Sequence, residues 1–424
     1  MQVSDHLFRR ESGRIVAALT RIFGVHNLAL AEDVAQDAFC RAMEVWPFRG
    51  VPENPAAWLM TTARHRAIDI LRRQRTARTF APELGRLLES EWTLVPIVDE
   101  TLAGAAIKDD LLRMMFSCCH PRLGDDVQVA LVLHILCGFG IDETAAAFLS
   151  TEAAMYKRIS RAKKLLASSK RLFDLTDDDC AARLAAVQRA LYLLFNEGYH
   201  GASAESSVRM ELCDEAIRLA MLLVEHALTA TASSYALAAL MHLHAARLPA
   251  RLDAGGNLSS LFDQDRAKWD TDLIASGLTL LSKSASGSEV SEYHVEAAIA
   301  AVHAKTARIE ETDWRRIVGL YDMLMVIRPS PVVALNRAIA VAQSEGAERG
   351  LEEIHAIADV ERMTSYPFYY AAVGELEHRC NRPDLAVRHF RAALACARNP
   401  MEQRFLQQRL DACLTRVRST HPHA

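Results

Sequence analysis

Apolar residues recur three and four positions apart along most of the chain, the spacing that places side chains on one face of an α-helix. Alternating runs of β-branched residues, which would indicate strands, are rare. The pattern therefore predicts an all-α protein. The clearest runs are Ile15, Ala18, Leu19, Ile22 and Phe23; Leu131, Leu133, Ile135 and Leu136; and Ala216, Leu219, Ala220 and Leu223.

Breaks in this pattern divide the chain into blocks. A first helical block, residues 1–75, ends in a run of arginines, and a second, residues 109–172, ends in a run of lysines and arginines. Between them, residues 76–108 are less periodic and contain prolines, which predicts a linker. Aspartates at 174–179 mark the next boundary, and residues 180–418 are helical again. We therefore expect two small helical domains followed by a larger helical extension, with loops near 249–265 and 282–288.

Composition excludes several classes of protein. The net charge of −4 over 424 residues means that any nucleic-acid binding must come from a local basic patch. No uninterrupted apolar stretch approaches the roughly 20 residues of a membrane helix, and the charged first ten residues do not resemble a secretory signal. Nine scattered cysteines without a CxxC pair do not form a disulfide framework. We expect a reduced, cytoplasmic protein.

The second block carries the pattern of a helix-turn-helix. A helix over 125–137 is broken at 138–140, a short helix spans 141–149, Ser150 and Thr151 form the turn, and a basic helix runs over 152–166. The apolar positions expected to face inward are Ala154, Met155, Ile159, Ala162, Leu165 and Leu166. The positions expected to face DNA are Thr151, Glu152, Tyr156, Lys157, Arg158, Arg161, Lys163 and Lys164. The alternative is a basic helix face that is only solvated.

The first block offers two further surfaces. Asp33, Gln36, Asp37 and Arg41 share one face of a helix over 28–46, which is typical of a docking surface, although polar helix faces are often merely solvated. A Pro/Gly/Asn loop over 47–55 then precedes an arginine-rich helix, a combination suited to single-stranded DNA. The residues of that helix are Trp58, Arg64, His65, Arg66, Arg72 and Arg73. Trp58 also suits a core anchor.

These motifs resemble a known family. Residues 31–39, AEDVAQDAF, and Trp58-Leu59 followed by ARHRAIDILRR at 63–73 resemble region 2 of extracytoplasmic-function sigma factors of the sigma-70 family. Residues 109–172, which begin with DDLLRMMFSCCHP at 109–121, resemble region 4 of a subgroup with a tetratricopeptide-like C-terminal extension. Residues 194–199, 263–266 and 331–338 resemble that extension.

The resemblance implies a non-enzymatic RNA polymerase sigma factor without cofactor or metal, which binds core polymerase and promoter DNA and initiates transcription. Region 2 would dock on the polymerase, and the loop over 47–55, with His65 nearby, would capture a flipped base of the −10 element. His65 stands where many relatives have Asn. Region 4 would read the −35 element and contact the polymerase flap, and the linker would pass through the active-site channel. The docking residues would be Asp33, Gln36, Asp37, Phe39 and Arg41.

The extension shows one clear tetratricopeptide-like repeat. Its offsets are met by Tyr370, Gly374, Ala386, Phe390 and Ala393. Stacked helix pairs form concave peptide-binding surfaces, so we expect the extension to regulate the sigma unit. Relatives in the subgroup are often encoded beside small YCII-like proteins, which are possible partners. A polar cluster, readable either as buried hydrogen bonds or as a ligand pocket, comprises Asn196, Glu197, Tyr199, Asp263, Asp265, Arg266 and Trp269.

Two other functions are less consistent with the sequence. A free-standing helix-turn-helix regulator with a sensing domain would need neither the face at Asp33–Phe39 nor the arginine-rich helix. A metal-dependent enzyme would need convergent ligands, and the adjacent Cys118 and Cys119 cannot both face one ion. The GxxxxGK[ST], GxSxG and HExxH motifs are absent from the sequence.

Overall fold

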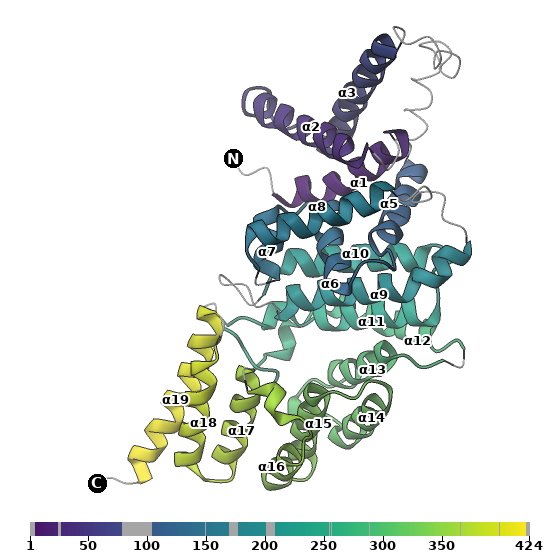
Figure 1. Ribbon diagram of the computed structural model, residues 1–424. Coiled ribbons are helices and arrows are strands. Elements are labelled where there is room, and N and C mark those ends of the chain that lie inside the picture. The colour runs from purple at the N-terminus through teal and green to yellow at the C-terminus, as the bar shows by residue number, and fades with distance from the viewer. Residues whose placement is uncertain are drawn as a thin grey trace. The chain divides into compact units, whose positions relative to one another are not determined.

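The computed structural model is built of α-helices with short 3₁₀ and π turns (Figure 1), which confirms the predicted all-α class. It describes residues 5–23, 27–78, 104–148, 150–168, 177–200, 208–253, 255, 257–287, 289–364, 366–397 and 399–420. Within these ranges the only extended pairing is an isolated bridge between Leu252 and Leu258. None of the described helices is long and apolar enough to cross a membrane.

The chain divides into two compact units. Unit 1 comprises Met1–Leu194 with Glu225–Thr229, and unit 2 comprises Phe195–Val224 with Ala230–Ala424. The first part of α9 belongs to unit 1, where Arg189 pairs with Asp125 at 2.6 Å and Arg183 donates to the carbonyl oxygen of Phe116. The helical extension proposed to start at residue 180 therefore contributes its first turns to unit 1.

Unit 1 is organised around its first helix, which packs against α2, α3, α5 and the π turn η2. Ile15, Ala18 and Leu19 have no exposed surface, as their spacing predicts. At Gly13 an added Cβ would lie 2.0 Å from the carbonyl oxygen of Leu136, so only glycine permits this approach to η2. The elements are α1 Asp5–Phe23, α2 Leu28–Arg49, α3 Pro55–Arg78, α5 Gly104–Cys118, α6 Asp125–Leu131, η2 Val132–Leu136, α7 Ile141–Ala147, α8 Glu152–Ser168 and α9 Asp177–His200.

The predicted single helix over 125–137 changes character part-way. It is α-helical only to Leu131 and continues as the π turn η2, in which the amide of Cys137 donates to the carbonyl of Val132 at 3.1 Å. Gly138 then reverses the chain with a φ of +68°. A π turn contains one extra residue and so changes which side chains face inward. Hydrophobic spacing alone does not reveal such an insertion.

The predicted linker over 76–108 is described only at its ends. Helix α3 continues to Arg78 and α5 begins at Gly104, so both ends are helical. Residues 79–103, including Pro82 and Pro96, lie outside the described residues.

Unit 2 is a succession of helices in which each member from α11 onward packs against the next (Figure 1). Local pairing of this kind follows from short connections between amphipathic helices. The elements are α10 Met210–Glu225, α11 Ala232–Ala245, η3 Leu248–Ala250, η4 Arg266–Lys268, α12 Thr271–Ser284, α13 Glu292–Ala304, η5 Ile309–Glu311, α14 Trp314–Ile327, α15 Pro331–Ser344, α16 Ala347–His355, η6 Val360–Met363, α17 Pro367–Arg379, α18 Pro383–Ala395 and α19 Pro400–Thr420. Glu225 itself belongs to unit 1.

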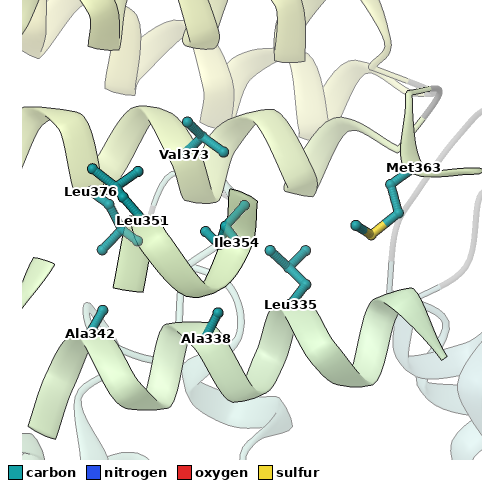
Figure 2. Packing of buried hydrophobic residues seen from close by; sticks show 8 residues of the cluster. All are labelled: Leu335, Ala338, Ala342, Leu351, Ile354, Met363, Val373 and Leu376. Atoms are coloured by element: carbon teal, nitrogen blue, oxygen red, sulfur yellow. The ribbon is translucent and has the colours of Figure 1, made fainter. Parts of the chain in front are cut away.

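One core cluster illustrates how these helices are joined. Figure 2 shows the apolar side chains of α15, α16 and α17 facing a shared interior. Small residues lie where the backbones approach: an added Cβ at Gly350 would lie 2.4 Å from that of Ala342. The cluster comprises Leu335, Ala338, Ala342, Leu351, Ile354, Met363, Val373 and Leu376.

Candidate functional site

Helix α2 buries one face and exposes the other. Its buried face is made of small and apolar residues, so the polar positions between them point outward. Asp33, Gln36, Asp37 and Arg41 are exposed, whereas Phe39 is half-buried. The structure therefore places four of the five predicted docking residues on one open helix face. The buried residues are Leu28, Ala31, Val34, Ala35, Ala38, Ala42 and Trp46.

Two residues of this face form ion pairs. Asp37 accepts a hydrogen bond from Nε of Arg66 on α3 at 2.8 Å, which joins a predicted docking residue to a predicted DNA residue. Arg41 pairs with Glu44 at 2.8 Å. All four side chains keep at least 41% of their surface exposed, and surface pairs contribute about 0–1 kcal/mol. These pairs therefore yield readily to a binding partner.

The start of α3 is fixed by packing and capping. Trp58 is half-buried and meets the buried Trp46 edge-on, with ring centroids 5.4 Å apart. The side chain of Asn54 accepts a hydrogen bond from the amide of Ala57 at 3.0 Å and caps the helix, which begins at Pro55. Trp58 thus acts as a packing anchor for α3, one of its two predicted roles.

Beyond this anchor, α3 presents basic side chains. His65, Arg72 and Arg73 are exposed, and Arg64 and Arg66 are half-buried. Nη2 of Arg64 lies 3.3 Å from Nε2 of His65. The helix therefore carries a basic strip along its length, as predicted.

The last turn of α2 carries an aromatic residue that sequence reasoning passed over. The expectation that the loop begins at Pro47 is wrong, because α2 continues to Arg49. Phe48 is 89% exposed and Val51 is 41% exposed. Exposed aromatic side chains beside a basic strip suit stacking on an unpaired base. The available signal was an apolar residue directly after Pro47 in an otherwise polar segment.

Two helices, α7 and α8, lie in the segment where a helix-turn-helix was predicted. Gly140 lies immediately before α7: its amide donates to Glu143 at 2.9 Å, and its carbonyl accepts from the hydroxyl of Thr144 at 2.7 Å. The hydroxyl of Thr151 accepts from the amide of Ala154 at 3.3 Å and caps α8, as predicted.

Helix α8 sorts its residues into a buried stripe and a basic face. Met155, Ile159, Ala162 and Leu166 are buried as predicted, and Leu165 is half-buried. The expectation that Ala154 faces inward is wrong, because it lies about 100° from the centre of the buried stripe and is exposed. Of the predicted DNA residues, Arg158 and Lys163 are half-buried. The exposed ones are Thr151, Glu152, Tyr156, Lys157, Arg161 and Lys164.

Lys163 is engaged within unit 1. Its ammonium lies 2.7 and 2.8 Å from the two carboxylate oxygens of Glu32 on α2 and 2.9 Å from Nε2 of His134 in η2. Since a lysine only donates, Nε2 accepts, and Nδ1 donates to the carbonyl of Phe139 at 2.8 Å. Burial, and after it Lys163, lowers the pKa of His134, which keeps the ring neutral.

A hollow of about 490 Å³ adjoins this contact. Asp33, Gln36 and Phe39 of α2 line it, together with Gly138–Gly140 of the turn. Part of the α2 face therefore lies across the hollow from the turn that precedes α7.

The predicted polar cluster in unit 2 divides into separate structural roles. Asp265 caps η4 by accepting from the amide of Ala267, and Asp263 pairs with Arg409. Arg266 donates to the carbonyl oxygens of His303 and Thr306, both at 2.9 Å. Tyr199 is buried and stacks on Phe195, while Asn196 and Glu197 are half-buried. Asp263, Asp265 and Arg266 therefore form structural hydrogen bonds within unit 2, which is one of the two interpretations of the polar cluster; the other was a ligand pocket.

The cysteines proposed and rejected as zinc ligands are core residues. Cys118, Cys119 and Cys137 are buried. Burial raises the pKa of the Cys119 thiol to about 12, which keeps it protonated and unsuited to metal binding. In the part of the chain that the structure describes, no three His, Cys, Asp or Glu side chains converge on a point suited to a metal.

Comparison with known proteins decides the family. Residues 7–77, which span α1, α2 and α3, match sigma-70 region 2. The chain belongs to the sigma-70 family. This sigma factor is 26% identical over 153 residues to the ECF RNA polymerase sigma factor SigX of Bacillus subtilis, covering 35% of the chain and 75% of SigX.

The remainder of the sigma factor has relatives without assigned function. Residues 183–285 match a family of unknown function (DUF6596). An uncharacterized protein of Rhizobium meliloti, R00370, is 40% identical over 399 residues, 93% of this chain and 92% of the relative. No solved structure matches the sigma factor.

Proposed function

We propose that this sigma factor binds core RNA polymerase through the exposed face of α2, contacts the −10 element with α3 and its preceding loop, and reads the −35 element with α8. The observation that carries the proposal is the exposed polar face of α2 directly beside the basic strip of α3, within the segment that matches region 2. Sigma factors act as non-enzymatic subunits, so these surfaces need only bind.

Polymerase docking is tested by reversing charge on α2. Asp33 and Asp37 are exposed, so Asp33→Lys and Asp37→Lys should leave the fold intact. We expect the double variant to lose co-elution with core polymerase in size-exclusion chromatography. Glu352→Lys, an exposed site in unit 2, is the matched control and should co-elute as the unchanged chain does. Failure of the unchanged chain to bind core polymerase would overturn the proposal in favour of a free-standing DNA-binding regulator.

Recognition of the −10 element would use the segment over 47–55. Flipping a base out of the duplex costs a few kcal/mol, and contacts between the flipped base and the protein must offset this cost. Phe48 offers an exposed ring for stacking, His65 lies on the adjoining helix, and Arg72 and Arg73 suit phosphates. We expect Phe48→Ala to slow promoter opening by the holoenzyme while leaving polymerase binding unchanged.

Recognition of the −35 element would use the first turns of α8. Thr151, Glu152 and Tyr156 lie near its N-terminus, where side chains of a recognition helix reach base edges, and Arg161 and Lys164 lie farther along, where they suit phosphates. Exchange of Glu152 for Gln should change sequence preference, whereas Arg161→Gln should weaken binding to all sequences alike and reduce the salt dependence. If the two variants showed the same sequence preference for −35 DNA, the assignment would be contradicted.

The extension would regulate the sigma unit as a tetratricopeptide-like array. Support comes from α17 and α18, where Ala386, Phe390 and Ala393 are buried and an added Cβ at Gly374 would lie 3.3 Å from the Phe390 ring. A small protein, of which a YCII-like protein is one candidate, would bind the array. A chain ending at residue 194 keeps the part of α9 that belongs to unit 1. Unchanged promoter activity of that truncated chain in cells would argue against regulation.

A further inference from the structure

A group of cationic and aromatic side chains in unit 2 is left without a role by the proposed function. Arg247 lies two residues beyond the end of α11. It is near Arg266 and Trp269 of the η4 segment and near His303 of α13. The Arg247 and Arg266 guanidinium carbons lie 5.5 and 5.0 Å from the centroid of the same Trp269 ring. We call these four residues the Arg247 cluster.

Arg247 is the least compensated member. It is only 9% exposed, and its one hydrogen bond among the described residues runs from Nε to the side-chain oxygen of Gln264 at 3.3 Å. Its two terminal nitrogens, with four N–H donors, therefore meet no acceptor in the described part of the chain. A guanidinium this deeply buried is costly unless its donors and charge are matched.

Other donors of the cluster are in the same condition. Nδ1 of His303, Nε1 of Trp269 and Nε of Arg266 are buried and have no hydrogen-bond partner among the residues that the structure describes. The terminal nitrogens of Arg266 are used, since they donate to backbone carbonyls and to Thr312. Buried polar groups are nearly always satisfied in native proteins, so several unused nitrogens in one place indicate acceptor atoms that the chain does not provide.

The charge of the cluster points to the same missing partner. Burial is the main cause that lowers the pKa of His303 to about 3, and the nearby charges of Arg247 and Arg266 act in the same direction. The acidic groups that act on Arg266 are Glu310 and Glu311, and neither forms an ion pair with it among the described residues. Asp263, on the segment leading into η4, is engaged by Arg409 instead.

We propose that the Arg247 cluster is an oxyanion site that binds a phosphate group. The two guanidinium groups supply two positive charges, which match a phosphate dianion, and the terminal nitrogens of Arg247 form a fork that fits two phosphate oxygens. The indole N–H of Trp269 and the imidazole of His303 provide further donors to the same ligand. The shared chemistry is that of free phosphate and of a phosphomonoester. The site is separate from the α2, α3 and α8 surfaces.

Calorimetric titration of the full-length chain tests the site directly. Inorganic phosphate is the first probe, with sodium chloride at equal ionic strength as the blank and sodium acetate as a second anion. We expect phosphate to bind with a dissociation constant of about 1 mM or lower. O-phosphoserine is the phosphomonoester probe, and binding tighter than that of phosphate would identify a monoester as the ligand.

Variants separate a ligand site from a structural cluster. Arg247→Gln should weaken phosphate binding at least about tenfold, whereas Arg247→Lys keeps the charge but loses the planar fork and should weaken it less. Arg388→Gln removes an exposed charge from α18 in the same unit and should bind phosphate normally. Circular dichroism would establish that each variant is folded, and Arg247→Lys serves if the glutamine variant is not.

Three results would overturn the proposal. One is an unchanged chain that shows no phosphate heat above the chloride blank at about 10 mM, which would mean that water fills the cluster. Acetate binding as tight as phosphate would remove the assignment to phosphate. Equal loss in Arg247→Gln and Arg388→Gln would show only a general charge effect. None of these results depends on polymerase or promoter DNA, so the proposed sigma function stands or fails separately.

Discussion

The ion pair between Glu32 and Lys163 joins α2, the proposed docking helix, to α8, the proposed recognition helix, and its removal should affect both. The ammonium lies 2.7 Å from a carboxylate oxygen, and each side chain is 23% exposed. At an effective dielectric constant of about 20, the attraction at this distance is about 6 kcal/mol. Most of it is cancelled by the desolvation of two charges, which leaves a net coupling of about 1–2 kcal/mol.

A double-mutant cycle measures that coupling. Glu32→Gln, Lys163→Met and the double variant should give an interaction energy of about 1–2 kcal/mol in the free energy of opening that amide hydrogen exchange reports for α8. Amide exchange at α8 measures the stability of unit 1 alone. Global unfolding of a chain with two units would mix the stabilities of both. The control cycle uses Arg41 and Glu44, whose side chains are 62% and 65% exposed, and should give less than about 0.5 kcal/mol.

The same substitution carries a functional consequence under the proposed function. If Lys163 binds a phosphate of the −35 element, it must first leave Glu32. Glu32→Gln should therefore strengthen binding of a −35 duplex about five- to thirtyfold, the equivalent of the coupling released. A coupling indistinguishable from that of the control cycle would refute the reasoning about the ion pair. A normal coupling with unchanged DNA affinity would refute the role of Lys163 at DNA.

Three other expectations concern stability. His303 is buried and His244 is half-buried. Desolvation, together with neighbouring arginines, lowers the pKa of each to about 3, so the unfolded chain binds more protons below its own histidine pKa of about 6.5. Stability should thus be full above that pH and fall by about 1.4 kcal/mol per pH unit per histidine as the pH drops toward 3, and a flat urea-denaturation profile between pH 7.5 and 5.5 would contradict this. Phe390→Ala should cost about 3–5 kcal/mol because the ring is 1% exposed, against less than about 1 kcal/mol for the 37%-exposed Leu385→Ala, both by urea denaturation followed through far-UV circular dichroism. Gly13→Ala should accelerate amide exchange in α1 and η2, since its Cβ would lie 2.0 Å from the η2 backbone, and unchanged exchange would show that the helices separate without cost.

Much of the architecture follows from local rules that act within a few residues. The all-α class, the outward face of α2 and the buried stripe of α8 all reflect the 3.6-residue period, which any stretch of sequence displays by itself. Thr151 likewise caps α8 because a hydroxyl just before a helix reaches an amide three residues on. Such features depend on neighbours in the chain, and they were predictable for that reason.

The exposure of Phe48 and the π turn η2 required the structure. Hydrophobic spacing assigns a residue to a helix face but does not show whether a side chain in the last turn of a helix is covered, and Phe48 at the end of α2 is 89% exposed. The extra residue of η2 breaks the period without a Pro or Gly inside the turn, so the sequence contains no local sign of it. In this protein the turn places His134 beside Lys163.

The sequence by itself determined the helical class, the order of the helices and the motifs that belong to the sigma-70 family. Only the tertiary structure decided which charged groups are engaged: Lys163 with Glu32, 131 positions apart in the chain, and Asp37 with Arg66. The same holds for the Arg247 cluster, whose members come from separate segments of unit 2. Contacts of this kind depend on how the helices pack against one another, and a repeating pattern within each helix does not specify that packing.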